Sequence, residues 1–111
     1  MNFTMYDEVT SEELCASAGS IILKSMANRH RLLILYTLKG RECSAGELEE
    51  IVGLSQSALS QHLARLRKDG LVRTRRAAQT IFYRLPDNHA RKILETMHSI
   101  FAQTGSTESS T

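Results

Sequence analysis

The stretch over residues 44–70 constrains the fold more than any other part of this 111-residue chain. It reads SAGELEEIVGLSQSALSQHLARLRKDG and carries the signals of two short helices joined by a tight turn. Ser44 and Glu47 have the spacing of a capping box, which opens the first of these helices. Gly53 turns the chain. The second helix is then predicted over 56–69, because a glycine follows directly and stops it.

The second helix of this pair has two distinct faces. Leu59, Leu63 and Leu66 recur at helical spacing, so they are predicted to dock the helix on the core. The other face carries only amides, hydroxyls and a small side chain, and it is slim enough to enter the major groove of DNA. Glutamine can pair with adenine through two hydrogen bonds, and serine can bind base edges or phosphate. The predicted base-reading residues are Gln56, Ser57, Ser60 and Gln61.

After the second helix the apolar pattern changes from helical to alternating. Residues 71–75 and 80–85 are rich in β-branched and aromatic side chains, which is typical of strands, and 76–79 is the predicted turn. The turn lacks an Asn-Gly pair, so the sequence leaves the register of the hairpin open. Two short helices followed by a hairpin predict a winged helix-turn-helix. The fold class is therefore mainly α with a small β-hairpin, in which four helices precede the hairpin and a fifth helix follows it.

Charge is distributed unevenly along the chain. Residues 65–84 hold seven basic side chains and one acidic one, or +6, whereas the rest of the chain holds seven basic and eleven acidic ones, or −4. A basic segment on a small domain indicates a surface for a polyanion. His62 either contacts a backbone phosphate or packs at the turn. The predicted contacts to the DNA backbone, from the second helix and from the wing, are Ser55, His62, Arg65, Arg67, Lys68, Arg73, Arg75, Arg76, Gln79 and Thr80.

Three further helices are predicted, over residues 11–26, 29–39 and 88–103. The first and last have apolar faces wider than a small core can cover, so the sequence predicts a two-fold homodimer that buries them. Such a dimer would set two reading helices about one DNA turn apart, some 34 Å. A monomer with both faces folded inward is the alternative. The predicted interface residues are Leu14, Ala18, Ile21, Ile22, Ile93, Leu94, Met97, Ile100 and Phe101.

The domain boundaries follow from composition. Residues 1–10 are expected to be flexible, 11–103 to form one DNA-binding and dimerisation domain, and the polar segment 104–111 to be disordered.

No apolar run is long enough to span a bilayer, and the amino terminus lacks the features of a secretion signal, so a cytoplasmic protein without a membrane partner is expected. Two cysteines, Cys15 and Cys43, are too few for a disulfide framework and are expected to be reduced and inert.

Enzyme activity is not expected. No Cys/His or Ser/His pair has a supporting third group, and there is no glycine-rich phosphate loop. The sequence also predicts no cofactor. Two alternatives to a DNA-binding regulator remain, namely a metal- or thiol-responsive derepressor on the same scaffold and a winged-helix protein-interaction module that does not bind DNA.

The chain resembles the ArsR/SmtB family of bacterial winged-helix repressors. The resemblance rests on MANRHRLLIL (26–35), SAGELEEIVGLSQSALSQHLARLRKDGLV (44–72) and RRAAQTIFYRL (75–85), and it is strongest for the branch of HlyU, BigR and NolR. It implies a dimeric DNA-binding regulator with its interface on the first and last helices. It also implies base reading by the four residues named above. The likeness to HlyU further suggests competition with a nucleoid silencing protein.

The sensing sites that the resemblance implies are incomplete here. Thiol-sensing members carry one cysteine in the second helix and one near the end of the last helix, where this chain has Tyr36 and residue 103, a glutamine. Metal-sensing members use cysteines at the start of the third helix or a carboxylate–histidine set on the last one. Of that last set only Asp87 and His89 match, and His98 is out of phase. These three side chains are weak metal candidates, since zinc needs three or four suitable ligands.

Overall fold

The computed structural model describes residues 10–110, and the side chains of residues 10–102. The expected flexible segment 1–10 therefore lies, except for Thr10, outside the described residues, as does residue 111. Within the described part no helix is long and apolar enough to cross a membrane. In chain order the elements are α2 (Ser11–Met26), α3 (Arg29–Gly40), β1 (Cys43–Ser44), α4 (Ala45–Val52), α5 (Gln56–Lys68), β2 (Arg73–Ala77), β3 (Thr80–Arg84) and α6 (His89–Ser110).

The helices begin at capping residues that satisfy their first backbone amides. Thr10 and Glu13 form a capping box at the start of α2, and Ser44 and Glu47 form the predicted one at the start of α4. The side chain of Asn28 accepts hydrogen bonds from the backbone amides of His30 and Arg31, which starts α3 directly after α2. These local signals explain why the predicted helix starts are confirmed within one residue.

The tight turn between α4 and α5 forms as predicted. Gly53 ends α4 in the left-handed region with a φ of 77°, where a side chain would be strained. Ser55 then caps α5 by accepting a hydrogen bond from the amide of Ala58. Gly70, with a φ of 78°, turns the chain after α5 and directs it toward the sheet.

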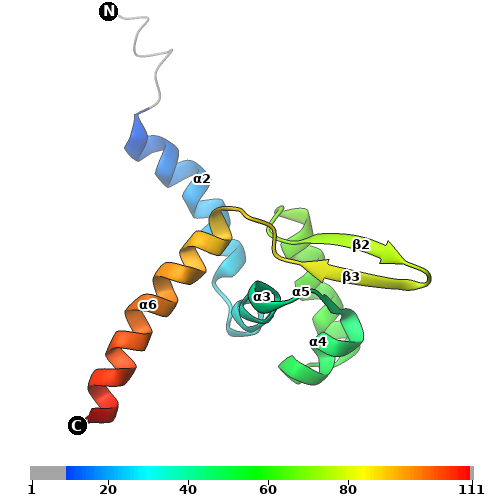
Figure 1. Cartoon of the computed structure of the whole chain (residues 1–111). Coiled ribbons are helices and arrows are strands. Elements are labelled where there is room, and N and C mark those ends of the chain that lie inside the picture. Colours follow the sequence, from blue (N-terminus) through cyan, green and yellow to red (C-terminus); the bar gives the residue numbers. More distant parts are fainter. Residues whose placement is uncertain (1–9, 111) are drawn as a thin grey trace, which may run out of the picture.

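The sheet has three strands in the order β1-β3-β2, all antiparallel, and Figure 1 shows the hairpin of β2 and β3. The sequence predicts only the hairpin, because β1 is two residues long and shows no alternation. The hairpin is also longer toward its tip than predicted, since Arg76 and Ala77 are paired with β3 and the loop is only Ala78 and residue 79. Ala78 has a φ of 57°, so the first loop residue takes the left-handed conformation without being glycine.

One apolar core joins the helices to the base of the sheet. Leu71 and Val72, predicted to start the first strand, are instead both buried in this core ahead of β2, so the alternation starts only at Arg73. The remaining buried side chains come from the helices, from Cys43 of β1 and from Leu85 after β3. They are Met26, Ile34, Leu35, Leu38, Leu48, Leu59, Leu63, Leu66, Ala90 and Leu94.

Helix α6 begins and ends differently from the prediction. Its first residue is His89, because the side chain of Asn88 accepts a hydrogen bond from the amide of Arg91 and acts as the cap. The helix continues to Ser110, so residues 104–110 are helical where the sequence predicts a disordered tail. Pro86 is the last proline in the sequence, so every residue of 104–110 keeps its backbone N–H group. The hydrogen bonds of α6 can therefore continue through this segment.

Helices α2 and α6 extend from one side of the molecule, and the hairpin projects from the other (Figure 1). Along α2 only the last two residues, Ser25 and Met26, are buried. A pocket of about 230 Å³ lies where α2, α3 and α6 meet, and apolar side chains, among them Leu23 and Met97, line it. Large apolar side chains of α2 (Leu14, Ile21 and Leu23) and of α6 (Ile100 and Phe101) are thus left exposed within one chain.

The predicted interface residues do not all lie on this uncovered surface. Leu14, Ala18, Ile21, Ile100 and Phe101 are exposed, and Ile22, Ile93 and Met97 are half-buried. Leu94 is the exception, because it is fully buried in the core of its own chain. It is therefore removed from the predicted interface.

Candidate nucleic-acid interface

The polar face of α5 is fully available to a ligand. Leu59, Leu63 and Leu66 are almost completely buried and fix the helix on the core, as predicted. All four predicted base-reading residues are exposed, namely Gln56, Ser57, Ser60 and Gln61. The helical repeat places Ser57 and Gln61 in one stripe, opposite the buried leucines, while Gln56 and Ser60 lie along one edge of it.

The basic residues at the end of α5 differ in whether an acidic side chain pairs with them. Arg65 donates a hydrogen bond to Asp69 one turn later, at 3.2 Å between Nε and Oδ2. Arg67 and Lys68 are exposed, and none of the described residues pairs with them. At the other end of the helix, the hydroxyl of Ser55 is engaged as the cap. At the carboxyl-terminal end of α5, Lys68 continues the exposed stripe, and Arg67 lies along the edge that carries Gln56 and Ser60.

His62 of α5 packs against the start of α3 and not at the turn between α4 and α5. Its Nδ1 lies 3.4 Å from Nη1 of Arg31, and its ring centroid lies 5.9 Å from that of His30. Since the guanidinium can only donate, Nδ1 accepts, and the imidazole is neutral in this contact. Burial lowers the pKa of His62, and the charges of Arg31 and His30 lower it further.

Arg31 of α3 contacts both α2 and α5, and the sequence does not predict this role. Its guanidinium donates to the backbone carbonyl of Ser25 and, at 3.3 Å, to that of Lys24, both in the last turn of α2. It also contacts His62 of α5. Burial lowers the pKa of Arg31, as does the nearby Arg65. No local pattern marks this residue, because its partners come together only when α2 and α5 pack on α3.

We call β2, β3 and their two-residue loop the wing. Strand alternation divides its arginines between the two faces of the sheet. Arg73 lies opposite Arg84 and Arg75 opposite Phe82, so these four side chains share one face. Arg76 pairs with Ile81, and this pair lies on the other face near the tip. Gln79 and Thr80, at the loop, are exposed.

Arg75 lies on the wing as predicted, but a carboxylate holds it. Its Nη2 lies 2.7 Å from Oε1 of Glu42, and its Nε lies 2.9 Å from both carboxylate oxygens. The guanidinium carbon also lies 4.7 Å from the ring centroid of Phe82. The hydrogen bond between them lowers the pKa of Glu42 and raises that of Arg75. Glu42 was missed because it is 33 residues away in the sequence.

The candidate metal and thiol residues do not form a cluster. Among the described side chains no group of three or more histidine, cysteine, aspartate or glutamate residues lies close enough to hold a metal ion. His98 lies instead beside the ring of Tyr36, with 6.5 Å between centroids. Cys43 is buried, and burial raises the pKa of its thiol. Cys15 is exposed on α2.

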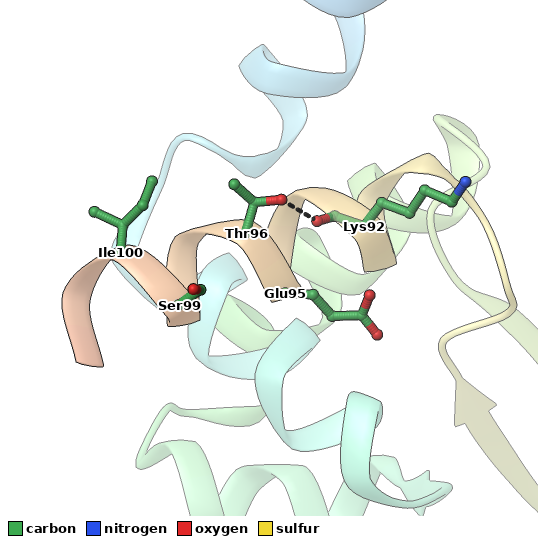
Figure 2. A pocket seen from close by; sticks show the side chains of 5 residues that line it. All are labelled: Lys92, Glu95, Thr96, Ser99 and Ile100. Carbon is green, nitrogen blue, oxygen red and sulfur yellow. Dashed lines mark hydrogen bonds between the residues drawn. The ribbon is translucent and has the colours of Figure 1, made fainter. Parts of the chain in front are cut away.

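A shallow hollow of about 500 Å³ runs along the polar side of α6 (Figure 2). Lys92, Glu95, Thr96, Ser99 and Ile100 line it, all from this one helix. The hydroxyl of Thr96 donates to the backbone carbonyl of Lys92 at 3.0 Å, so it serves the helix itself. We find no convergent set of polar groups in this hollow and assign it no ligand.

The sequence comparisons agree on one family. Residues 22–74 match the model of the bacterial regulatory proteins of the arsR family. The transcriptional activator HlyU of Vibrio cholerae is 52% identical over 83 residues, which cover 75% of this chain and 77% of that protein. The nodulation protein NolR of Rhizobium meliloti is 45% identical over 101 residues, or 91% of this chain and 83% of NolR.

Solved structures give the same result for the fold. Reduced HlyU from Vibrio cholerae superimposes with a TM-score of 0.77 at 46% identity, over 84% of this chain and 98% of that one. The repressor BigR from Xylella fastidiosa gives a TM-score of 0.76 at 38% identity, over 84% and 97%. The predicted winged helix-turn-helix is confirmed. These relatives show that the chain belongs to the arsR family of bacterial regulatory proteins, and its polar α5 face and basic wing agree with this.

Proposed function

We propose that this protein is a transcriptional regulator that binds a palindromic DNA operator as a homodimer and reads its sequence through α5. Its membership of the arsR family makes it a DNA-binding transcriptional regulator and not an enzyme. The observation that carries the proposed reading mode is the exposed stripe of Ser57 and Gln61, held rigidly on three buried leucines. A preorganised polar helix loses little entropy when it enters a groove.

Contacts to the DNA backbone are assigned to the basic side chains around this stripe. Arg67 and Lys68 lie at the end of α5, and Arg73 and Arg76 lie on the wing. Each is exposed and unpaired among the described residues, so each can neutralise a phosphate. Such contacts set the position of α5 on the duplex but carry no base information.

The dimer is assigned to the uncovered apolar faces of α2 and α6. Ile21 is 60% exposed and Phe101 is 63% exposed, and large apolar side chains left uncovered on two helices of a small domain favour an interaction site. We assign a second copy of this chain as the partner that covers these side chains. A two-fold axis would bury the same surface on both chains and present two α5 helices to one face of DNA. The pocket lined by Leu23 and Met97 lies beside this surface.

The test is selection of bound duplexes from a random-sequence library, followed by affinity measurement. The proposal expects an inverted repeat whose half-sites are centred about one helical turn apart, roughly 10 base pairs. It also expects a complex of two chains per duplex by sedimentation. Recovery of no enriched sequence, or of a single half-site bound by one chain, would contradict it.

The direction of regulation separates two candidates. BigR is named a repressor and HlyU an activator, and both are similar to this chain. We propose repression by operator occupancy as the first candidate, and relief of silencing by displacing a nucleoid silencing protein as the second. A reporter fused to the selected operator distinguishes them. Repression persists in a strain without nucleoid silencing proteins, whereas activation by displacement disappears there.

A further inference from the structure

The contact between Glu42 and Arg75 is the strongest polar interaction on the wing. The two side chains make three close nitrogen–oxygen contacts of 2.7–2.9 Å, which use both carboxylate oxygens. Charge-assisted pairs with two contacts are both stronger and more directional than single ones. Arg75 is therefore held in one orientation in the free protein.

The sheet order explains how residues so far apart in sequence meet. Glu42 directly precedes β1, which pairs with β3, and β3 in turn pairs with β2, which carries Arg75. The guanidinium lies over Phe82 of the central strand, so its side chain follows the sheet surface toward Glu42. The pair links the two outer strands and turns the guanidinium toward the body of the protein.

The pair also separates Arg75 from the other wing arginines. Arg73, Arg76 and Arg84 form no ion pair with any described residue, whereas Arg75 is neutralised. A phosphate that approaches Arg75 must compete with a carboxylate already in place. The arginine is still about half exposed, so nothing else blocks its access to DNA.

We propose that Glu42 limits DNA affinity by occupying Arg75, so that this arginine contributes no phosphate contact in the wild-type complex. This inference rests on the proposed function of DNA binding. It differs from the general expectation that every wing arginine grips the duplex. Glu42 is a positioning residue here, because it acts through Arg75 and not on the DNA itself.

The proposal gives a definite salt dependence. In Glu42→Gln the carboxylate charge is lost, Arg75 is released, and each protomer gains one phosphate contact. Two added contacts in a dimer steepen the slope of log affinity against log salt by about 1.8, so the variant loses about 12-fold more affinity than wild type between 50 and 200 mM salt. The gain in affinity over wild type is therefore expected to be largest at the low-salt end of the series.

The matched control is Glu95→Gln, which removes the same charge from an exposed position on α6 (Figure 2). It is expected to leave the salt slope at its wild-type value. The double variant Glu42→Gln with Arg75→Ala is as neutral at this site as the intact pair, so it is expected to bind with wild-type affinity and slope. Arg75→Ala alone leaves the Glu42 carboxylate unpaired on the wing, so it is expected to bind more weakly than the double variant. Fluorescence anisotropy on a labelled duplex, in a salt series, measures all of these.

Several outcomes would overturn the proposal. One is a wild-type slope in Glu42→Gln, and another is an equal increase in affinity in Glu95→Gln, which would indicate a general charge effect. A flatter slope in the double variant than in wild type would show that Arg75 contacts phosphate in the wild-type complex, because this variant removes the arginine without leaving an unpaired carboxylate. Failure of the proposed function is distinguishable, because wild type would then bind no duplex at all.

Discussion

Replacing Ile21 with alanine tests the proposed dimer surface. Ile21 is 60% exposed on α2, and fully burying an isoleucine stabilises by about 1.5–3 kcal/mol, so the partner gains roughly 0.9–1.8 kcal/mol by covering it. Alanine keeps one of the four side-chain carbons, so about three quarters of this gain is lost, and two-fold symmetry doubles the loss to about 1.4–2.7 kcal/mol per dimer. The dissociation constant of the dimer is then expected to rise roughly 10- to 100-fold.

Sedimentation equilibrium over a range of protein concentrations measures this constant directly. Alanine favours helices more than isoleucine does, so a loss of dimer cannot be attributed to unfolding of α2. The control is Ile51→Ala, because Ile51 is 51% exposed on α4 and lies outside the proposed interface. Ile51→Ala is expected to keep the wild-type constant. An unchanged dimer in Ile21→Ala, or equal weakening in both variants, would refute the assignment.

Three more predictions concern the wing and the helix junction. Arg76→Ala should weaken binding to all duplexes alike and flatten the salt slope by about 0.9 per protomer, as anisotropy would show; a sequence-dependent loss would contradict it. The pKa of His62 is lowered in the folded state, so the folded protein binds fewer protons there than the unfolded chain does. Urea unfolding should therefore show stability falling as pH drops below about 6.5, less steeply in His62→Gln, and equal slopes would argue against this. Ala78→Gly should stabilise the fold by about 1 kcal/mol, because a φ of 57° strains alanine; a lower melting temperature would contradict it.

The sequence predicts the helix starts well because caps act over three or four residues. Ser44 with Glu47, and Asn28 ahead of α3, satisfy amides within their own turn, so the structure confirms both. The leucine stripe of α5 is confirmed for a similar reason, since a helix with one apolar face has a single way to pack. The exposure of Ser57 and Gln61 on the opposite face follows from the same periodicity.

What the sequence does not predict depends on contacts between distant residues. Leu94 shares the apolar face of α6 with exposed side chains, and periodicity cannot tell which part of that face covers its own core. The ion pair between Glu42 and Arg75 spans three strands, and its acidic member lies in a connection with no pattern. Arg31 looks like one more surface cation until α2 and α5 pack around it.

The central claim is that side chains on the exposed stripe of α5 read bases. The most direct measurement compares wild type with Gln61→Ala on a selected operator and on every single-base variant of one half-site. The account predicts that Gln61→Ala loses about 1–3 kcal/mol of discrimination at one base pair per half-site and keeps the wild-type preference elsewhere. An unchanged preference at every position would contradict it, as would an equal loss of affinity for all the duplexes.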